Sequence, residues 1–211
     1  MLALYSCNNE APVDVPKGDK TTQYVESLLA NASKNLDLDA LVEEFVSKAF
    51  VLETVYHKGV YIDGDYHKDV WKEDRVVSWP GVMPEGIVYG DDVCFVYSLE
   101  PVFAYPATAP PILRCDEYPC EIEQSNRELL LLFTGKNSDV THSARVVDFI
   151  DGKVIIAGRL PFHDKRTADN GEVRYVYIGY FDVDIQAEWD AVIAEQDKSH
   201  YIPTSLTKEA I

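Results

Sequence analysis

The stretch from Val146 to Ile156, VVDFIDGKVII, decides the fold class of this chain. An Asp-Gly pair stands between two largely apolar arms, and such a pair suits a two-residue type I′ turn because both central residues of that turn take positive φ. A turn at Asp151-Gly152 pairs Ile150 with Lys153 and predicts an antiparallel hairpin. Side chains alternate along each arm, so one face collects apolar residues. We expect that face to lie in the core, and it is made of Val147, Phe149, Val154, Ile156 and Leu160.

The same pattern continues on both sides of this hairpin. Asp63-Gly64 and Asn170-Gly171 predict two more two-residue turns, and Tyr89–Asp92 marks a looser one. With a further strand at Glu128–Thr134, the chain is expected to hold eight or more strands, nearly all linked to their sequence neighbours. Antiparallel strands in such a meander must hide their edges. We therefore expect a closed barrel or a two-sheet sandwich.

Apolar residues at helical spacing predict three helices outside the meander. Two lie near the N-terminus, at Thr22–Ala32 and Asp39–Phe50, and one near the C-terminus, at Gln186–Gln196, where Trp189 lies on the apolar side. The fold class is thus α+β, mainly antiparallel β, with two N-terminal helices and one C-terminal helix.

Two long stretches carry a resemblance to a known architecture. The first, FVSKAFVLETVYHKGVYIDGDYH, is a helix that leads into a long hairpin. The second, ARVVDFIDGKVIIAGRLPFHDKRTADNGEVRYVYIGYFDVD, is the closing meander. Together they resemble the small lipocalin-like barrels of lipid-anchored bacterial proteins. The resemblance implies a barrel that binds a ligand.

The residues Leu4, Tyr5, Ser6 and Cys7 resemble the lipobox of bacterial lipoproteins. In that motif Leu stands three residues before Cys and a small residue precedes Cys, so the resemblance implies lipidation of Cys7 and removal of residues 1–6. A signal peptide also needs a longer apolar core than is present here, so we expect that the recorded start is internal or that the signal was trimmed. The alternative is an ordinary N-terminus with a buried cysteine.

These observations predict the organisation of the chain. It has 211 residues, of which 46% are hydrophobic, enough for the core of one domain. We expect a remnant of a lipoprotein signal at residues 1–7, a flexible tether at 8–20, a helical segment at 21–50, an antiparallel β-domain with the C-terminal helix at 51–200, and a tail at 201–211.

The charge of the chain limits its partners. It has 36 acidic and 19 basic residues and a formal net charge of −17. Such a charge repels nucleic-acid phosphates and anionic membrane surfaces, so we expect no nucleic-acid partner and contact with a membrane only through the lipid anchor. The expected localisation is the cell envelope, as a periplasmic or outer-membrane lipoprotein.

The sequence RCDEYPC places four residues between Cys115 and Cys120. In an oxidising compartment this spacing predicts a small disulfide loop. The alternative is two reduced cysteines in a loop. A zinc site would need further thiols or histidines at short spacing, and none stands nearby in the sequence.

Acidic and histidine-containing segments do not form a recognisable catalytic or metal motif. An Asp63-Gly64 turn pairs Val60 with His67 and His57 with Val70, which places the two histidines on opposite faces. We expect an acidic, solvated hairpin there, with no metal and no cofactor. Glu121 and Glu123 share a strand face, but this spacing does not distinguish paired catalytic carboxylates from a solvent face.

The segment Glu100–Glu123 contains five prolines, together with Phe103, Tyr105 and Tyr118. Because proline cannot donate to a sheet, we expect most of this segment to cross the surface as a stiff loop. Such a loop either has a function or only seals one end of the barrel.

Tyrosines are the candidate ligand contacts. A turn at Asn170-Gly171 places on one face the residues Leu160, Phe162, Val173, Tyr175, Tyr177 and Phe181. Pockets combine apolar walls with a few polar groups, so we expect Tyr175 and Tyr177 to contact a ligand and Tyr105 to act as a lid. The alternative is that these rings only fill the core.

The sequence favours a non-catalytic, lipid-anchored envelope protein that binds a small amphiphile, glycan or peptide. Its alternative is a structural or accessory subunit of an envelope protein assembly, and a remote alternative is a hydrolase of extracellular polymers. An aromatic patch exposed on a filled barrel favours the accessory subunit, whereas a hollow mouth lined by rings favours ligand binding.

Overall fold

The structure is a computed structural model that describes residues 20–32, 36–75, 83–100, 111–125, 127–135, 141–162 and 173–200. Its three helices are α1 (Lys20–Ala30), α2 (Leu38–Ser47) and α3 (Ile185–His200). Its strands are β1 (Ala49–Ile62), β2 (Asp65–Arg75), β3 (Gly86–Tyr89), β4 (Val93–Glu100), β5 (Ile112–Ser125), β6 (Glu128–Thr134), β7 (Thr141–Ile150), β8 (Lys153–Gly158) and β9 (Tyr175–Asp182). Residues 1–19 and 201–211, which include Cys7 and the expected tether and tail, lie outside the described residues.

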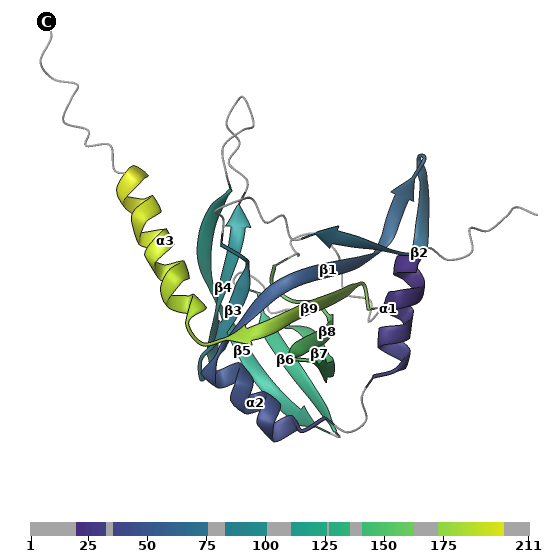
Figure 1. Ribbon diagram of the computed structural model, residues 1–211, viewed down its shortest axis with the longest axis horizontal. Coiled ribbons are helices and arrows are strands. Elements are labelled where there is room, and N and C mark those ends of the chain that lie inside the picture. The colour runs from purple at the N-terminus through teal and green to yellow at the C-terminus, as the bar shows by residue number, and fades with distance from the viewer. Residues whose placement is uncertain are drawn as a thin grey trace, which may run out of the picture.

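Eight antiparallel strands close into a barrel. Figure 1 shows how the strands are arranged. From β3 to β9 the strands follow one another in sequence order, and β1 completes the ring because it pairs with both β3 and β9. The closing registers are Phe50 with Ile87 on one side and Ala49 with Asp182 on the other. The structure is thus α+β with a barrel, and the barrel is compatible with a lipocalin-like fold.

β2 is outside the ring. It pairs with the second half of β1, from Thr54 to Ile62, whereas β3 pairs with the beginning of the same edge of β1. The β1–β2 hairpin therefore extends beyond the barrel wall, at the upper right of Figure 1.

Both Asp-Gly turns that the structure describes form as expected. Asp63 and Asp151 each have φ of 52°, followed by Gly64 at 95° and Gly152 at 75°, so all four residues have the positive φ of a type I′ turn. The registers Val60 with His67 and Ile150 with Lys153 are confirmed. The predicted turn at Asn170-Gly171 lies outside the described residues.

The barrel interior forms one apolar cluster, and α2 lies at one of its ends. Phe45 of α2 contacts three rings from the strands, at centroid distances of 6.5 Å to Phe50, 5.2 Å to Tyr89 and 4.8 Å to Phe181. Asp37 caps the helix, since its side chain accepts a hydrogen bond from the backbone N–H of Ala40 at 3.1 Å. The helix thus stands over this end, and we call it the α2 end.

The other two helices cover the outside of the barrel (Figure 1). α1 packs Val25 against Trp71 of β2 and Val176 of β9. α3 packs Trp189 against Tyr97 of β4, with their rings stacked at 4.5 Å, and the Trp189 indole N–H donates to the Pro84 carbonyl oxygen at 2.8 Å. Both helices therefore bury apolar side chains that point outward from the strands.

Two strand irregularities change the expected pairing, and one of them also changes which residues share a face. A bulge between Lys58 and Val60 pairs His57 with Lys72, so the prediction that His57 faces Val70 is wrong. A second bulge between Val146 and Asp148 turns Val147 to the outer cluster under α1. The first irregularity adds two residues to β2 and keeps the alternation, whereas the second adds one residue to β7 and so reverses the alternation beyond it. The sequence pattern alone reveals neither.

Two predicted element boundaries are also corrected. The second helix ends at Ser47, and Phe50 belongs to β1, where its ring points into the barrel. The second half of the proline-containing segment is strand β5, not a loop. The N–H of Cys120 donates to Asp92 beside β4, and backbone N–H groups alternate in direction, so the nitrogen of Pro119 points toward β6. Pairing with β6 begins only at Cys120. Pro119 is therefore tolerated, because no hydrogen bond to β6 is required from its nitrogen.

Candidate functional site

The two ends of the barrel differ in their connections. At the α2 end, β3 joins β4 through Gly90–Asp92, and β7 joins β8 through Asp151-Gly152. At the opposite end, β4 joins β5 through residues 101–111 and β8 joins β9 through residues 159–174. We call this second end the loop end. Ligand sites commonly lie among long connections on a rigid scaffold, so the loop end is the first place to consider.

The described interior below the loop end is filled with side chains. Phe50, Ile87, Leu131 and Ile156 each have 0% of their surface exposed. A cavity wider than a water molecule would leave its lining atoms accessible, so no such cavity borders these side chains. A deep central pocket is therefore not a feature of this part of the barrel.

The predicted ligand contacts Tyr175 and Tyr177 lie together on β9, but only one of them reaches the surface. Their rings stack at 6.1 Å with an angle of 22°. Tyr177 is fully buried, its hydroxyl accepts a hydrogen bond from the Leu160 N–H at 3.3 Å, and burial raises its pKa. Tyr175 is half-buried and pairs with His57 at the loop end. Tyr105, the predicted lid, lies outside the described residues.

A polar pair also lies at the loop end, on β4 and β5, which β1 and β3 separate from β9. Glu100, the last residue of β4, contacts Arg114 of β5 at 3.4 Å, and both side chains are about half exposed, at 53% and 51%. By register they lie on the same side of their strands as the interior residues Val96 and Tyr118. The loop end thus combines half-buried aromatic surface with one exposed ion pair.

The structure separates the cysteines that the sequence suggested as a disulfide. Cys115 and Cys120 are five positions apart on the single extended strand β5, so their side chains point to opposite sides of the barrel wall. Cys120 is part of the interior cluster, whereas Cys115 is exposed and hydrogen-bonds to Tyr97 beside α3. A strand rises about 3.3 Å per residue, and a disulfide needs Cα atoms within about 7 Å, so the predicted Cys115–Cys120 bridge is wrong.

The tip of the β1–β2 hairpin is the most exposed aromatic feature among the described residues. Tyr61 and Tyr66 face each other across the strands with ring centroids 5.2 Å apart, yet 77% and 52% of their surfaces are exposed. Ile62 beside them is 44% exposed. We call the segment Gly59–His67 the ribbon, because β1 there pairs only with β2 among the described residues.

Gly59 helps to shape the ribbon. Its φ is +90°, and the Tyr66 ring lies so close that an added Cβ atom would collide with the Tyr66 hydroxyl group. Because Gly59 has no side chain, the Tyr66 ring packs directly on the β1 backbone there, and it also contacts the Tyr61 ring. We call this contact of Tyr66 with Gly59 the seat of Tyr66. The two rings are held in place although little of their surface is buried.

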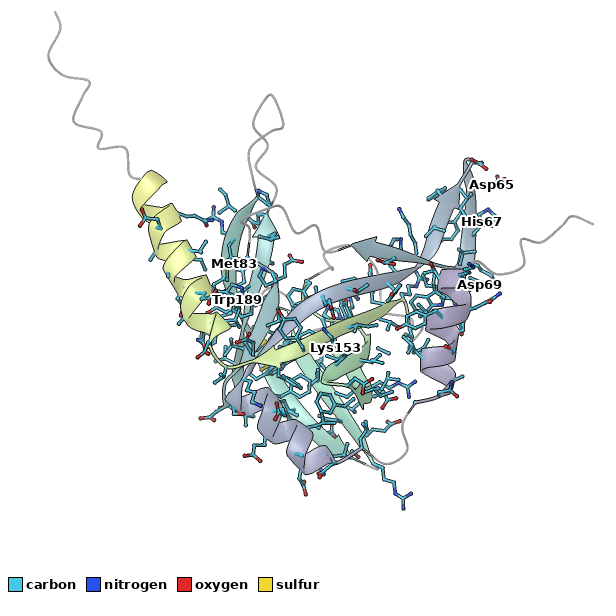
Figure 2. All side chains as sticks on the ribbon, in the orientation of Figure 1. Asp65, His67, Asp69, Met83, Lys153 and Trp189 are labelled. Atoms are coloured by element: carbon cyan, nitrogen blue, oxygen red, sulfur yellow. The ribbon has the colours of Figure 1, made fainter. Side chains whose placement is uncertain are left out.

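The base of the ribbon is fixed to α1 through Trp71 of β2. Its indole N–H donates to Glu26 at 2.7 Å, and its backbone N–H donates to the Thr22 hydroxyl at 3.1 Å. The Lys58 ammonium lies 5.8 Å from the centre of the Trp71 ring and 3.8 Å from the Asp69 carboxylate. Figure 2 shows Asp65, His67 and Asp69 along this hairpin, away from the labelled residues at α3. The base of the ribbon is therefore held to α1 by two hydrogen bonds from Trp71.

The other acidic and histidine residues form no compact site in the described part of the chain. Nowhere in that part do three or more His, Cys, Asp or Glu side chains gather closely enough to hold a metal ion. Glu121 and Glu123 are exposed on the barrel wall, opposite Leu132 and Leu130. Neither glutamate is enclosed in a pocket by its strand neighbours.

Glu85 has an altered pKa. Glu85, just before β3, is largely buried, and this burial raises its pKa above 4.5, while a hydrogen bond from the Leu99 N–H at 2.8 Å lowers it. The backbone carbonyl of Glu85 also accepts a bond from the Leu52 N–H at 2.9 Å. Because both contacts hold neighbouring strands, we interpret Glu85 as a residue of the barrel wall.

Sequence reasoning missed the aromatic tip of the ribbon. It treated YIDGDY as part of an acidic, solvated hairpin and took the tyrosines near residue 175 as the ligand contacts. A usable indication was present: Tyr61 and Ile62 precede the turn and Tyr66 follows it, so apolar side chains lie at a hairpin tip. What the sequence could not show is that no third strand covers them.

The chain was compared with protein families, curated proteins and solved structures. No protein-family profile matches the chain, and no curated protein or solved structure matches it either. Among the described residues, none of the helices has the length and apolar character required to cross a membrane. A function must therefore be argued from the geometry described above.

Proposed function

We propose that the protein is a non-catalytic accessory subunit of a cell-envelope assembly, and that it docks on a partner protein through the ribbon tip. The observation that carries this proposal is the exposed pair Tyr61 and Tyr66 on a ribbon that stands outside a filled barrel. Exposed tyrosines are typical of protein interfaces, where they bury a large apolar ring and keep a polar hydroxyl group at its edge.

The geometry of the ribbon supports docking in two ways. Its rings are already held together and seated on Gly59, so binding would immobilise few side chains. Its base is fixed by Trp71 and α1, so the tip is presented on a rigid support. Preorganised aromatic groups that enter a cleft are typical anchors of an interface.

Charge indicates the chemistry of the partner. Exposed Asp63 and Asp65 border the two rings, and the whole chain has a net charge of −17. The fitting partner is a protein with an apolar cleft for the rings, bordered by lysine or arginine side chains. Complementary charge would speed its association and orient the ribbon.

Site-specific photo-crosslinking in the native envelope tests this proposal. A photoreactive phenylalanine analogue replaces Tyr66 in one variant and Glu121, on the exposed barrel wall, in a matched control. We expect one discrete crosslinked protein from position 66 and none from position 121. The purified partner should then bind the Tyr61→Ser/Tyr66→Ser variant at least about tenfold more weakly, as for the loss of an interface anchor.

Two results would refute docking through the ribbon. Equal crosslinking from positions 66 and 121 would mean that the ribbon is not a preferred contact. Unchanged affinity of the double variant for the crosslinked partner would mean that the rings do not contribute to binding. A crosslink to a second copy of this chain would mean that the ribbon forms a homo-oligomer contact, and the proposal of an accessory subunit would be wrong.

The second candidate is the capture of a small amphiphile, glycan or peptide at the loop end. It is favoured by the half-buried Tyr175 of β9 and by the exposed pair Glu100 and Arg114 of β4 and β5, because all three lie at the loop end. Arrays of glycans and of lipids probed with the purified protein test it. We expect Tyr175→Ala to lose any signal and Tyr61→Ser to keep it; the reverse pattern would exclude the loop end.

The lipid anchor at Cys7 remains part of the proposal. α1 begins at Lys20, and Thr22 in its first turn bonds to the base of the ribbon, so the segment that leads back to Cys7 leaves the described fold near the ribbon. A palmitate analogue supplied to cells should label the native protein and not Cys7→Ala. Equal labelling of both proteins would refute the anchor.

A further inference from the structure

Two thiols meet inside the barrel, and they are not the pair that the sequence suggested. Cys94 lies on β4 opposite Tyr118 of β5, and Cys120 follows Tyr118 by two residues on the same side of β5. The N–H of Cys120 donates to the Asp92 carbonyl at 3.1 Å, which fixes this register. Cys94 and Cys120 are therefore diagonal neighbours across an antiparallel pair, and both point into the interior cluster.

The side chains of the pair are in contact. The Cys94 thiol donates a hydrogen bond to the Cys120 sulfur. This bond lowers the pKa of Cys120, and the same bond together with burial raises the pKa of Cys94. The Tyr89 hydroxyl is close to both sulfurs and has no hydrogen-bond partner among the described residues. Cys120 is the half-buried and more acidic thiol of the two.

We propose that Cys94 and Cys120 form a disulfide bond that joins β4 to β5 inside the barrel. Diagonal neighbours of an antiparallel pair have Cα atoms about 7–8 Å apart and a disulfide needs about 7 Å or less, so the bond requires a small approach of β4 and β5 as the sulfurs come to about 2.05 Å. Cys115 takes no part, because it lies on the outer side of β5 and hydrogen-bonds to Tyr97. The bond would close the chain from residue 94 to residue 120, across residues 101–110.

A low-molecular-weight disulfide such as oxidised glutathione is a sufficient oxidant. The Cys120 thiolate attacks one sulfur of this disulfide, so a mixed disulfide forms on Cys120 and one glutathione thiolate leaves. Cys94 then gives up its proton and attacks the Cys120 sulfur, which forms the internal disulfide and releases the second glutathione thiolate. The two protons from the cysteines end on two glutathione thiols, so two cysteines are oxidised as one disulfide is reduced.

The experiment is peptide mapping of the purified protein after equilibration with oxidised glutathione. Remaining thiols are alkylated without reduction, and the peptides are identified by mass spectrometry. We expect one linked peptide pair, Cys94 with Cys120, while Cys115 is alkylated or carries glutathione. The matched control Cys115→Ser should form the same link, and Cys120→Ser should not. Closing this loop should raise the melting temperature by about 10 °C, a shift that reduction reverses.

The mapping on the unaltered protein does not depend on the folding of any variant. Recovery of Cys94 and Cys120 as separately alkylated peptides would overturn the proposal. A link between Cys115 and either other cysteine would overturn it as well, because it would require a register different from the one described.

Discussion

The protein contains two hairpins with the same Asp-Gly turn and very different surroundings. At the β7–β8 tip, Phe149 contacts Phe181 at 6.2 Å, and β8 pairs with β9 as far as Lys153, directly after the turn. At the β1–β2 tip, Tyr61 contacts Tyr66, and the ribbon has no third strand among the described residues. The turn residues determine the register of each hairpin, whereas the neighbouring strands determine whether the side chains at its tip are packed or exposed. The aromatic rings of the ribbon are not explained by the fold, and this is why we assign them to binding.

Substitution of Trp71, at the base of the ribbon, should cause the largest loss of stability. Trp71 is buried and bonded to Glu26 of α1, so Trp71→Ala removes a large buried ring and the attachment of α1 together. We expect a loss of about 3–5 kcal/mol in the free energy of unfolding, measured with denaturant. Trp71→Phe retains most of the ring and should lose clearly less. Equal losses in both variants would show that the indole hydrogen bond, and not packing, secures the base.

The β7–β8 tip should depend on its aromatic residue. Phe149 is 40% exposed but packs on Phe181, which in turn contacts Phe45 of α2. Phe149→Ala should lower the free energy of unfolding by about 1–2 kcal/mol, less than for a fully buried ring. Equilibrium unfolding measures this loss. A change indistinguishable from zero would make the two tips alike and remove the contrast on which the account depends.

The seat of Tyr66 can be tested with two glycines of the same hairpin. Gly59 and Gly64 have φ of 90° and 95°, but only at Gly59 would an added Cβ atom meet Tyr66. Each substitution by alanine should cost about 1 kcal/mol through backbone strain. Only Gly59→Ala should also break the contact between the Tyr61 and Tyr66 rings, seen as lost proton–proton contacts in NMR spectra. Loss of those contacts in Gly64→Ala would contradict the proposed seat.

Glu85 in the barrel wall should make the stability of the barrel depend on pH. The pKa of Glu85 is higher in the folded protein than in the unfolded chain, where it is about 4.5. The protonated carboxyl group therefore stabilises the fold fully below pH 4.5, and this stabilisation is lost as the pH rises through the folded-state pKa. Glu85→Gln keeps an oxygen for the Leu99 N–H and removes the buried charge, so it should be more stable than the unaltered protein at pH 7. This gain should disappear toward pH 4. Melting temperatures of Glu85→Gln and of the unaltered protein, measured between pH 4 and pH 7, test this expectation. A Glu85→Gln protein that is less stable than the unaltered protein at pH 7 would contradict the assignment.

The comparison also shows how much the sequence could predict. Asp63-Gly64, Asp151-Gly152 and the strand Glu128–Thr134 were predictable because turn residues and a short apolar run are local features of the sequence. The bulges near Gly59 and Val147 were not, since each depends on how a neighbouring strand pairs. The expected face at β8 and β9 is confirmed for Leu160 and its neighbours except Val173, which packs under α1.

The candidate sites were less predictable than the fold. Proximity in sequence suggested Cys115 with Cys120, but a disulfide depends on proximity in space, and the strand register brings Cys94 to Cys120. Tyr177 carries the aromatic pattern of a ligand contact, yet the closed barrel buries it completely. Whether a tyrosine is exposed depends on which strands surround it, and this information is spread over the whole chain.

The most direct test of the account is the free energy of unfolding of Tyr61→Ser/Tyr66→Ser relative to the unaltered protein. If the rings serve binding and not the fold, the two values should agree within about 0.5 kcal/mol, as for ordinary surface substitutions. A loss of about 2 kcal/mol or more would show that the fold needs these rings. That result would contradict the assignment of the ribbon tip to a partner.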